Sequence, residues 1–242
     1  MKIDASGLHY RTLNDRINAA VEDGTSEIEL ENVCGHRYIG AGLGSGVHIT
    51  INGTPGNDLA SFMNGAEITV NGNAQDGVGN TMNEGKVVIH GDAGDIPAHS
   101  MRGGKIFVRG LVGYRAGIHM KAFRDRVPVL VVGRTAGDYA GEYMAGGVMI
   151  ILNLDNQDSS PAGNYLGTGM HGGAIFMRGQ VDEFQLGQEV GLEDMTDEDR
   201  QTLNSVIEEY AETMNLDLTI GPEEFIKLIP RTTRPYGKLY AY

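Results

Sequence analysis

A glycine-rich string at Gly40, Gly42 and Gly44 is the short motif best suited to chemistry, because glycine-rich turns can wrap phosphate groups. In nucleotide-binding folds such a turn leads into a helix, whose N-terminal amides and dipole attract the phosphates. Here Ser45 and Gly46 follow, and after them comes an alternating stretch that is typical of a strand. The pattern therefore favours a tight backbone turn over a nucleotide-binding loop.

Histidines form the second candidate site. The chain has seven, and none makes an HExxH motif or an i, i+4 helical pair of the kind that binds zinc. His99 and His119 occupy similar places in successive repeats, so their rings could stack close together. Two stacked turn histidines are more typical of structure than of a metal site, and we expect no metal there.

Acidic residues form the third candidate. Asp76 and Asp95 each lie four residues after a repeated glycine, and stacked carboxylates can bind calcium. A calcium site of this kind needs more converging acids than these two, and polar ladders are ordinary in solenoid turns. The sequence contains no Ser–His–Asp arrangement and no nucleophile elbow. It thus predicts no catalytic, cofactor-binding or metal-binding residue in this chain.

The segments that carry these residues repeat at a fixed interval. Gly53, Gly72, Gly91 and Gly110 are 19 residues apart, and each ends a stretch in which apolar residues alternate with others. Three later stretches keep the alternation with longer spacers, at residues 127–133, 147–153 and 173–179. A short strand that recurs about every 20 residues is typical of a parallel β-helix. We expect about seven coils.

The alternation predicts which side chains fill the solenoid. Residues two and four positions before each closing residue are apolar and should point inward. They are Ile49, Ile51, Ile68, Val70, Val87, Ile89, Ile106, Val108, Val129, Val131, Met149, Ile151, Ile175 and Met177. A methionine row nine positions before the closing residue predicts flexible core filling, at Met63, Met82, Met101, Met144 and Met170. His48, Glu67, Lys86 and Lys105 share an outward position and should face solvent or a partner.

The two ends of the chain differ from the repeat. Residues 1–35 are predicted to form a cap, whose helix begins after Thr12 and ends at Gly24. Residues 36–180 form the β-helix. In residues 181–242, Thr196 precedes an acidic first turn and an amphipathic helix, which should pack on the side or the open end of the solenoid. We expect one structural domain overall.

A basic and aromatic tail follows that helix. Arg231, Arg234 and Lys238 lie close together in an otherwise acidic chain. They could contact a partner, or they could bind the acidic surface of the chain itself.

Composition narrows the function. The formal net charge of −13 disfavours binding to nucleic acids and to anionic membranes. The single cysteine, Cys34, excludes an internal disulfide, a CxxC pair and an all-cysteine iron–sulfur cluster. No signal peptide and no run of about 20 apolar residues is visible in the sequence. We expect a cytoplasmic protein.

Several segments together resemble the GXGXG domain of the glutamate synthase large (alpha) subunit. They are residues 3–9, 30–33, 37–44, 63–68 and 101–106, within a resemblance that covers about residues 1–180. The resemblance implies a right-handed parallel β-helix without catalytic groups of its own. In the whole enzyme it lies between a glutamine amidotransferase domain and a synthase domain that carries FMN and an iron–sulfur cluster. That enzyme hydrolyses glutamine, passes ammonia to 2-oxoglutarate and reduces the imine to glutamate.

This chain lacks the reactive parts of that enzyme. Position 2 is Lys2, whereas such an amidotransferase needs an N-terminal cysteine, and the only thiol is the internal Cys34. A flavin barrel alone needs about 250 residues. The resemblance therefore implies a stand-alone scaffold subunit, with the amidotransferase, FMN and the iron–sulfur cluster on partner subunits and no cofactor in this chain.

Three alternatives stay open. Related assemblies such as N-methylglutamate synthase use the same domain as a separate chain, so the product is not fixed. The β-helical subunit of a formylmethanofuran dehydrogenase has similar repeats. An independent β-helix protein acting on carbohydrate is the third, although such a protein usually has a secretion signal and an acidic cluster beside a basic residue. Association of two copies of the chain is a further prospect.

Overall fold

A computed structural model describes residues 1–155 and 160–231 of the chain. Its strands form one sheet of eleven, in the order β1-β2-β3-β4-β5-β6-β7-β8-β9-β11-β10. The strands are β1 (Lys2–Asp4), β2 (Glu27–Cys34), β3 (His48–Thr54), β4 (Asn64–Asn71), β5 (Glu84–Ile89), β6 (Lys105–Val108), β7 (Val129–Val132), β8 (Ala145–Ile151), β9 (Gly172–Arg178), β10 (Val190–Glu193) and β11 (Phe225–Pro230). The helices are α1 (Tyr10–Glu22) and α2 (Asp197–Met214), with short 3-10 turns η1 (Glu183–Gln185) and η2 (Pro222–Glu224).

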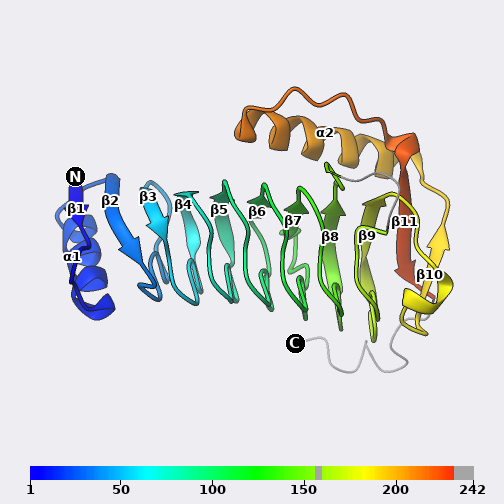
Figure 1. Cartoon of the computed structure of the whole chain (residues 1–242), viewed down its shortest axis with the longest axis horizontal. Coiled ribbons are helices and arrows are strands. Elements are labelled where there is room, and N and C mark those ends of the chain that lie inside the picture. The colour runs from blue at the N-terminus through cyan, green and yellow to red at the C-terminus, as the bar shows by residue number, and fades with distance from the viewer. Residues whose placement is uncertain (156–159, 232–242) are drawn as a thin grey trace.

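The middle of the chain is a parallel β-solenoid, as the repeat predicted. Ile49 pairs with Ile68 and Val87 with Ile106, so equivalent residues of successive repeats lie side by side. Figure 1 shows the strands as successive rungs from β2 to β9, with α1 at one end and β10 and β11 at the other. The seven repeated strands, β3 to β9, are joined by six turns of the solenoid. The expected count of about seven coils was thus slightly high.

The inward rows form one continuous core. Ile51, Val70, Ile89 and Val108 lie on equivalent positions and are completely buried. The predicted methionine row is also buried, and each of its members is at most 1% exposed. Met120 belongs to the same buried row. The sequence did not indicate it, because extra residues place it more than nine positions before Gly133. The methionines therefore fill the core between coils, as predicted.

The prediction was wrong by one residue in β7. Leu130 and Val132 point into the solenoid, whereas Val129 and Val131 belong to a second apolar cluster on the outer face. The pairing of Val108 with Val132 sets this register. All four residues of β7 are apolar, so alternation cannot tell the two faces of this strand apart.

The N-terminal segment covers one end of the core. Leu13, Ile17 and Ala20 of α1 are buried, and the cap helix that the sequence predicted is present. The helix begins earlier than expected, however, because His9 rather than Thr12 is its N-cap and accepts a hydrogen bond from the backbone N–H of Arg11. An imidazole is an uncommon cap, so the usual signal was missing.

The C-terminal segment covers the other end and one side. Thr196 caps α2 as predicted, in a capping box with Asp199. The buried residues of α2 pack on the outer face of β5 to β9. The strand β11, which the sequence did not indicate, pairs antiparallel with β9 and then with β10. In the described parts of the chain, neither helix has the length and apolar character needed to cross a membrane.

Candidate functional site

The GxGxG motif lies in a turn between β2 and β3. Gly40 and Gly42 have φ angles of +73° and +70°, a left-handed conformation that favours glycine. A Cβ on Gly40 would also lie 2.3 Å from the Cδ1 atom of Ile68, so the core of the next coil leaves no space there. Gly44 forms a bridge to Asn64 at the start of β4. The motif thus serves close packing between coils, which agrees with the interpretation as a backbone turn.

The same turn recurs in every coil, and we call it the left-handed turn. Three residues with positive φ alternate with residues of negative φ. The first positions are Tyr38, Asp58, Gly77, Ile96, Arg115, Tyr139 and Tyr165; the middle ones are Gly40, Ala60, Gly79, Ala98, Gly117, Gly141 and Gly167; the third are Gly42, Phe62, Thr81, Ser100, His119, Tyr143 and Gly169. Middle positions are only Gly or Ala because they face the core. First and third positions point outward and admit large side chains.

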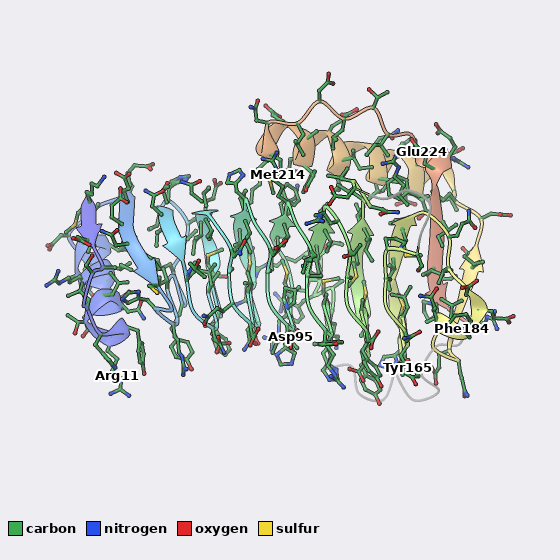
Figure 2. All side chains as sticks on the ribbon, viewed as in Figure 1. Arg11, Asp95, Tyr165, Phe184, Met214 and Glu224 are labelled. Atoms are coloured by element: carbon green, nitrogen blue, oxygen red, sulfur yellow. The ribbon has the colours of Figure 1, made fainter. Side chains whose placement is uncertain are left out.

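Large side chains at these outward positions stack in two rows. The guanidinium carbon of Arg115 lies 4.7 Å from the ring centre of Tyr139, and the rings of Tyr139 and Tyr165 stack at 4.7 Å. In the second row, the rings of His119 and Tyr143 stack at 5.3 Å and are nearly parallel, at 8°. We call these five residues the aromatic strip. In Figure 2, Tyr165 lies at the edge opposite Met214, the last residue of α2.

The histidine pair suggested by the sequence lies at one end of this strip. The rings of His99 and His119 are 6.1 Å apart, as the repeat suggested. Burial lowers the pKa of His99, and the neighbouring His119 lowers it further. The imidazole of His99 is therefore neutral at neutral pH. In residues 1–155 and 160–231, no three His, Cys, Asp or Glu side chains converge in a group that could hold a metal ion.

The acidic ladder binds backbone rather than ligand. The Oδ1 atom of Asp76 accepts a hydrogen bond from the backbone N–H of Asp95 at 2.9 Å. The Oδ1 atom of Asp95 accepts one in turn from the backbone N–H of Tyr114 at 2.8 Å. A Cβ on Gly94 would lie 2.2 Å from Asp76 Oδ1, and one on Gly113 would lie 2.0 Å from Asp95 Oδ1, which explains the glycine that faces each acid from the next coil. Each of these carboxylates therefore links its coil to the next by a hydrogen bond. The acidic ladder stabilises the turns of the solenoid.

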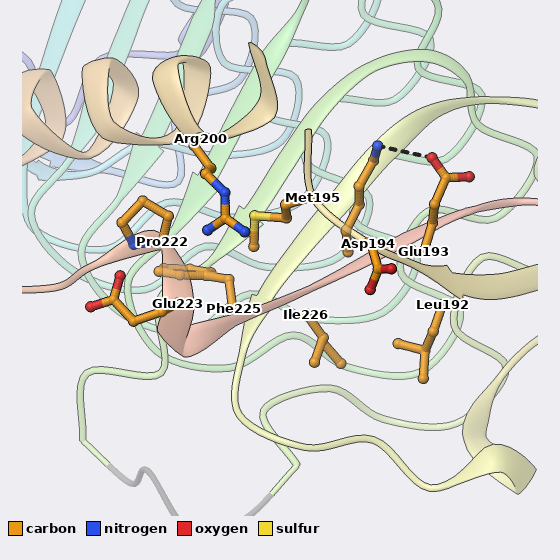
Figure 3. A pocket seen from close by; sticks show the side chains of 10 residues that line it. Leu192, Glu193, Asp194, Met195, Arg200, Pro222, Glu223, Phe225 and Ile226 are labelled. Carbon is orange, nitrogen blue, oxygen red and sulfur yellow. Dashed lines mark hydrogen bonds and ion pairs between the residues drawn. The ribbon is translucent and has the colours of Figure 1, made fainter. Parts of the chain in front are cut away.

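A groove of about 710 Å³ lies where β10, β11 and the start of α2 meet (Figure 3). Lys227 donates hydrogen bonds to Glu193 at 3.3 Å and to Asp199 at 2.7 Å. Burial alone would lower the pKa of Lys227, but these two carboxylates outweigh it and raise the pKa. The amine therefore stays protonated and is neither a base nor a nucleophile. Arg200 points into the same groove in Figure 3.

Both lysines of the outward row have a partner within the chain. Lys86 and Lys105 both donate to the carboxylate of Glu209 on α2, Lys86 at 3.0 Å. Burial alone would raise the pKa of Glu209, but the hydrogen bonds from Lys105 and Lys86 outweigh it and lower the pKa overall. The sequence left solvent or a partner open for these lysines, and the occupant is a helix more than 100 residues away in the chain.

The basic tail is only partly described. The backbone N–H of Arg231 donates to the carbonyl of Glu189 at 2.6 Å, and its side chain lies against Gly191 of β10. Arg234 and Lys238 lie outside the described residues. Contact of this tail with a partner stays a prediction.

Fold and turns together define a class: a parallel β-solenoid whose coils are closed by repeated left-handed turns. The family model described as the GXGXG motif matches residues 13–221, so the chain belongs to the GXGXG motif family. The resemblance drawn from the sequence is thereby confirmed at the level of the family.

Two further proteins are similar to this chain. One is "Uncharacterized protein MJ1350" of Methanocaldococcus jannaschii, which is 47% identical over 248 residues, covering 98% of this chain and 95% of that protein. The other is a chain in the crystal structure of the formyltransferase/hydrolase complex (FhcABCD) from Methylorubrum extorquens with methylofuran. Its TM-score is 0.63 with 20% identity, and the match covers 88% of this chain and 87% of that one. At this identity the likeness extends to the fold alone.

Proposed function

We propose that this chain is a non-catalytic scaffold subunit of a glutamate-synthase-like complex. It would join a glutamine amidotransferase subunit to a synthase subunit that carries FMN and an iron–sulfur cluster. The observation that carries the proposal is the family match over residues 13–221, the domain type of the glutamate synthase alpha subunit. In this proposal the reactive groups lie on other polypeptides.

The described side chains support a structural rather than a chemical role. The carboxylates of Asp76 and Asp95 accept backbone hydrogen bonds, and Lys227 is held by two acids. Each of these groups, which could otherwise act as an acid, a base or a ligand, thus has a partner that serves the fold. A rigid solenoid with occupied polar groups suits the positioning of other subunits.

The test is reconstitution. The chain, the amidotransferase subunit and the synthase subunit of the source cell would be purified separately and mixed, and glutamine-dependent glutamate formation would be measured. We expect a complex of all three and at least about tenfold faster glutamate formation with the chain than without it, because effective concentration favours ammonia transfer. A chain that binds neither subunit in the mixture would overturn the proposal.

A formyl-transferring complex is the second candidate, because the structural neighbour is a chain of such an assembly. The discriminating experiment is affinity purification of the tagged chain from its native cell. Recovery of amidotransferase and flavin subunits favours the first candidate, and recovery of formyltransferase or hydrolase subunits favours the second. Glycan hydrolysis by the pure chain would instead support the independent carbohydrate-active protein.

A further inference from the structure

The chain returns along α2 as an extended segment. Residues 215–221 follow the end of α2 and run back beside it towards η2 (Figure 1). Leu216, Leu218 and Ile220 are partly buried against the outer apolar cluster, whereas Asp217 and Thr219 are exposed. This alternation is typical of a strand with one buried face. Within residues 1–155 and 160–231, however, no backbone N–H or C=O group of residues 217–220 makes a hydrogen bond. The segment therefore resembles an edge strand without a neighbour.

A groove of about 670 Å³ lies between this segment and α2. Its helical wall is formed by Asn204, Ile207, Glu208 and Ala211, which share one face of α2 because they are spaced at i, i+3, i+4 and i+7. The opposite wall is formed by residues 216–221. Backbone groups of successive residues point to opposite sides of an extended chain, so every second residue of this wall can pair with a strand laid in the groove.

Acids line this groove, and no lysine or arginine does. Glu208, Asp217 and Glu223 are exposed and make no ion pair with any residue that the structure describes. A fourth acid, Glu224, is bound to Arg178 at 2.7 Å. Residues 179–226 contain one basic residue, Arg200, which lies with Glu223 in the neighbouring groove beside β11. It offsets at most one of the three unpaired carboxylates, so the groove stays negative.

A second groove that the segment borders has balanced charge. It has a volume of about 480 Å³ and is lined by two bases and two acids, Arg109, Arg134, Asp92 and Asp155. Arg134 is bound to Asp155. Burial lowers the pKa of His90 in the same groove, and Arg109 lowers it further, so this imidazole adds no charge at neutral pH. Charge therefore singles out the groove on the side of α2.

We propose that the groove between α2 and residues 216–221 binds an extended segment of a partner subunit that carries lysine or arginine side chains. The backbone of the partner pairs with every second residue of 217–220, and its bases lie against Glu208, Asp217 and Glu223. Addition of a strand to an unpaired extended segment is a recurring mode of recognition, in which main-chain hydrogen bonds supply affinity and side chains supply specificity.

The inference rests on the proposed function and deepens it, because it names the surface that a partner subunit occupies and the chemistry of that partner. Charge favours a different chain over a second copy of this one. Two copies, each with a net charge of −13, repel each other overall.

The first experiment neutralises the groove in the full chain with Glu208→Gln, Asp217→Asn and Glu223→Gln. These exposed side chains have no partner in the described ranges, so we expect a melting temperature within about 4 °C of the parent. Affinity for the purified amidotransferase or synthase subunit, whichever binds the parent chain, should fall at least about tenfold at low salt. The salt dependence of binding should become flatter, because three charges no longer attract the bases of the partner.

The matched control makes the same change in net charge on the N-terminal cap, with Asp15→Asn, Glu22→Gln and Asp23→Asn. All three acids are exposed and lie at the end of the solenoid that α1 covers. Salt screens charges at that distance from the groove, so the control should change the affinity less than about twofold.

The second experiment follows the backbone of the segment by hydrogen exchange. Binding of the subunit should slow the exchange of about two of the four amides of residues 217–220, because an added strand bonds to every second residue. Binding that leaves the exchange of this segment unchanged would overturn the inference.

Other outcomes separate the inference from the proposed function. If the groove variant binds as tightly as the parent, the inference is wrong while the proposed function stands. If the parent chain binds neither subunit, both are wrong. If Arg234→Gln with Lys238→Gln quickens the exchange of residues 217–220 in the free chain, the occupant is the chain's own basic tail. If the groove variant abolishes only self-association, the occupant is a second copy. Either of these last two results overturns the inference.

Discussion

The outer face of the solenoid sheet has two halves that share one interior. On β5 to β9 each strand contributes at least one outward apolar residue, from Val88 to Phe176, and α2 packs on these residues through Tyr210 and its neighbours. On β2 to β4 the outward residues are Glu, Thr, Asn and His, and no segment within residues 1–155 and 160–231 covers them. Inward residues are alike in both halves, from Ile49 to Met177. Outward residues alone therefore decide where a helix docks.

One row of paired residues marks the boundary between the halves. His48, Glu67, Lys86 and Lys105 follow one another along the sheet. Glu209 of α2 binds the two lysines. The next residue of the row, Glu67, would repel the same carboxylate, so charge as well as apolar area stops the helix at β5. The comparison yields predictions about how each half responds to substitution.

Tyr210→Ala should have the largest effect. The ring of Tyr210 is fully buried, packs edge-on against Phe107 at 5.5 Å and donates a hydrogen bond to the carbonyl of Val108 at 3.1 Å. Its removal should lower the free energy of unfolding by about 3–5 kcal/mol, measured by urea denaturation. Tyr210→Phe, the control, should lose only about 1 kcal/mol. Equal losses for both variants would show that the hydrogen bond, not packing, holds the helix.

Glu209→Gln should have the next effect. Two half-buried lysines would lose their charged partner, so we expect a loss of about 1–2 kcal/mol, less than for a fully buried pair. Hydrogen exchange of the α2 amides should quicken accordingly. The control is Glu208→Gln, an exposed neighbour, which should lie within about 0.5 kcal/mol of the parent. An unchanged exchange rate in Glu209→Gln would mean that apolar packing alone fixes α2.

The half of the outer face that α2 covers, on β5 to β9, which we call the covered half, also shows how much could be predicted from the sequence. Alternation and a constant interval predicted the solenoid, its inward rows and the amphipathic face of α2, because those patterns follow directly from strand and helix geometry. Which residues of β7 point inward could not be predicted, since Val129 and Leu130 are both apolar. The docking place of α2 depends on contacts such as Glu209 with Lys86, 123 residues apart, which no local pattern reveals.

The candidate site was predictable to a lesser degree. Equal spacing brought out His99 and His119 and also Asp76 and Asp95, and the structure places both pairs in neighbouring coils. The aromatic strip was missed because its residues hold positive φ without being glycine. One signal could have found it: the place of Gly42 in the GxGxG motif recurs in each coil, and large side chains occupy it in later coils.

Acid should loosen the covered half through Glu209. Its pKa in the folded chain is lowered from 4.5, so the carboxylate stabilises the fold above its unfolded pKa and this contribution is lost as the pH falls below about 4.5 towards the folded value. Glu224, whose pKa is also lowered, should act in the same direction on η2. Hydrogen exchange of α2 at pH 6 and pH 3.5 (approximate values on either side of this window), corrected for intrinsic rates, should show a loss of protection that is smaller in Glu209→Gln. Equal losses would place the titrating group elsewhere.

Thr69→Val should have the smallest effect on stability. The reverse substitution on the neighbouring strand, Val88→Thr, should have a larger one. Thr50, Thr69 and Val88 lie in one row of the outer face, the threonines on the bare half and Val88 under α2. Valine and threonine have nearly the same shape and β-propensity, so Thr69→Val should change the free energy of unfolding by less than about 0.5 kcal/mol and leave the mass in light scattering unchanged. The reverse change, Val88→Thr, buries a hydroxyl beneath the helix and should cost about 1–3 kcal/mol. If Thr69→Val instead stabilised the chain by more than about 1 kcal/mol, the row at β4 would be buried in solution, and the bare half would not be bare.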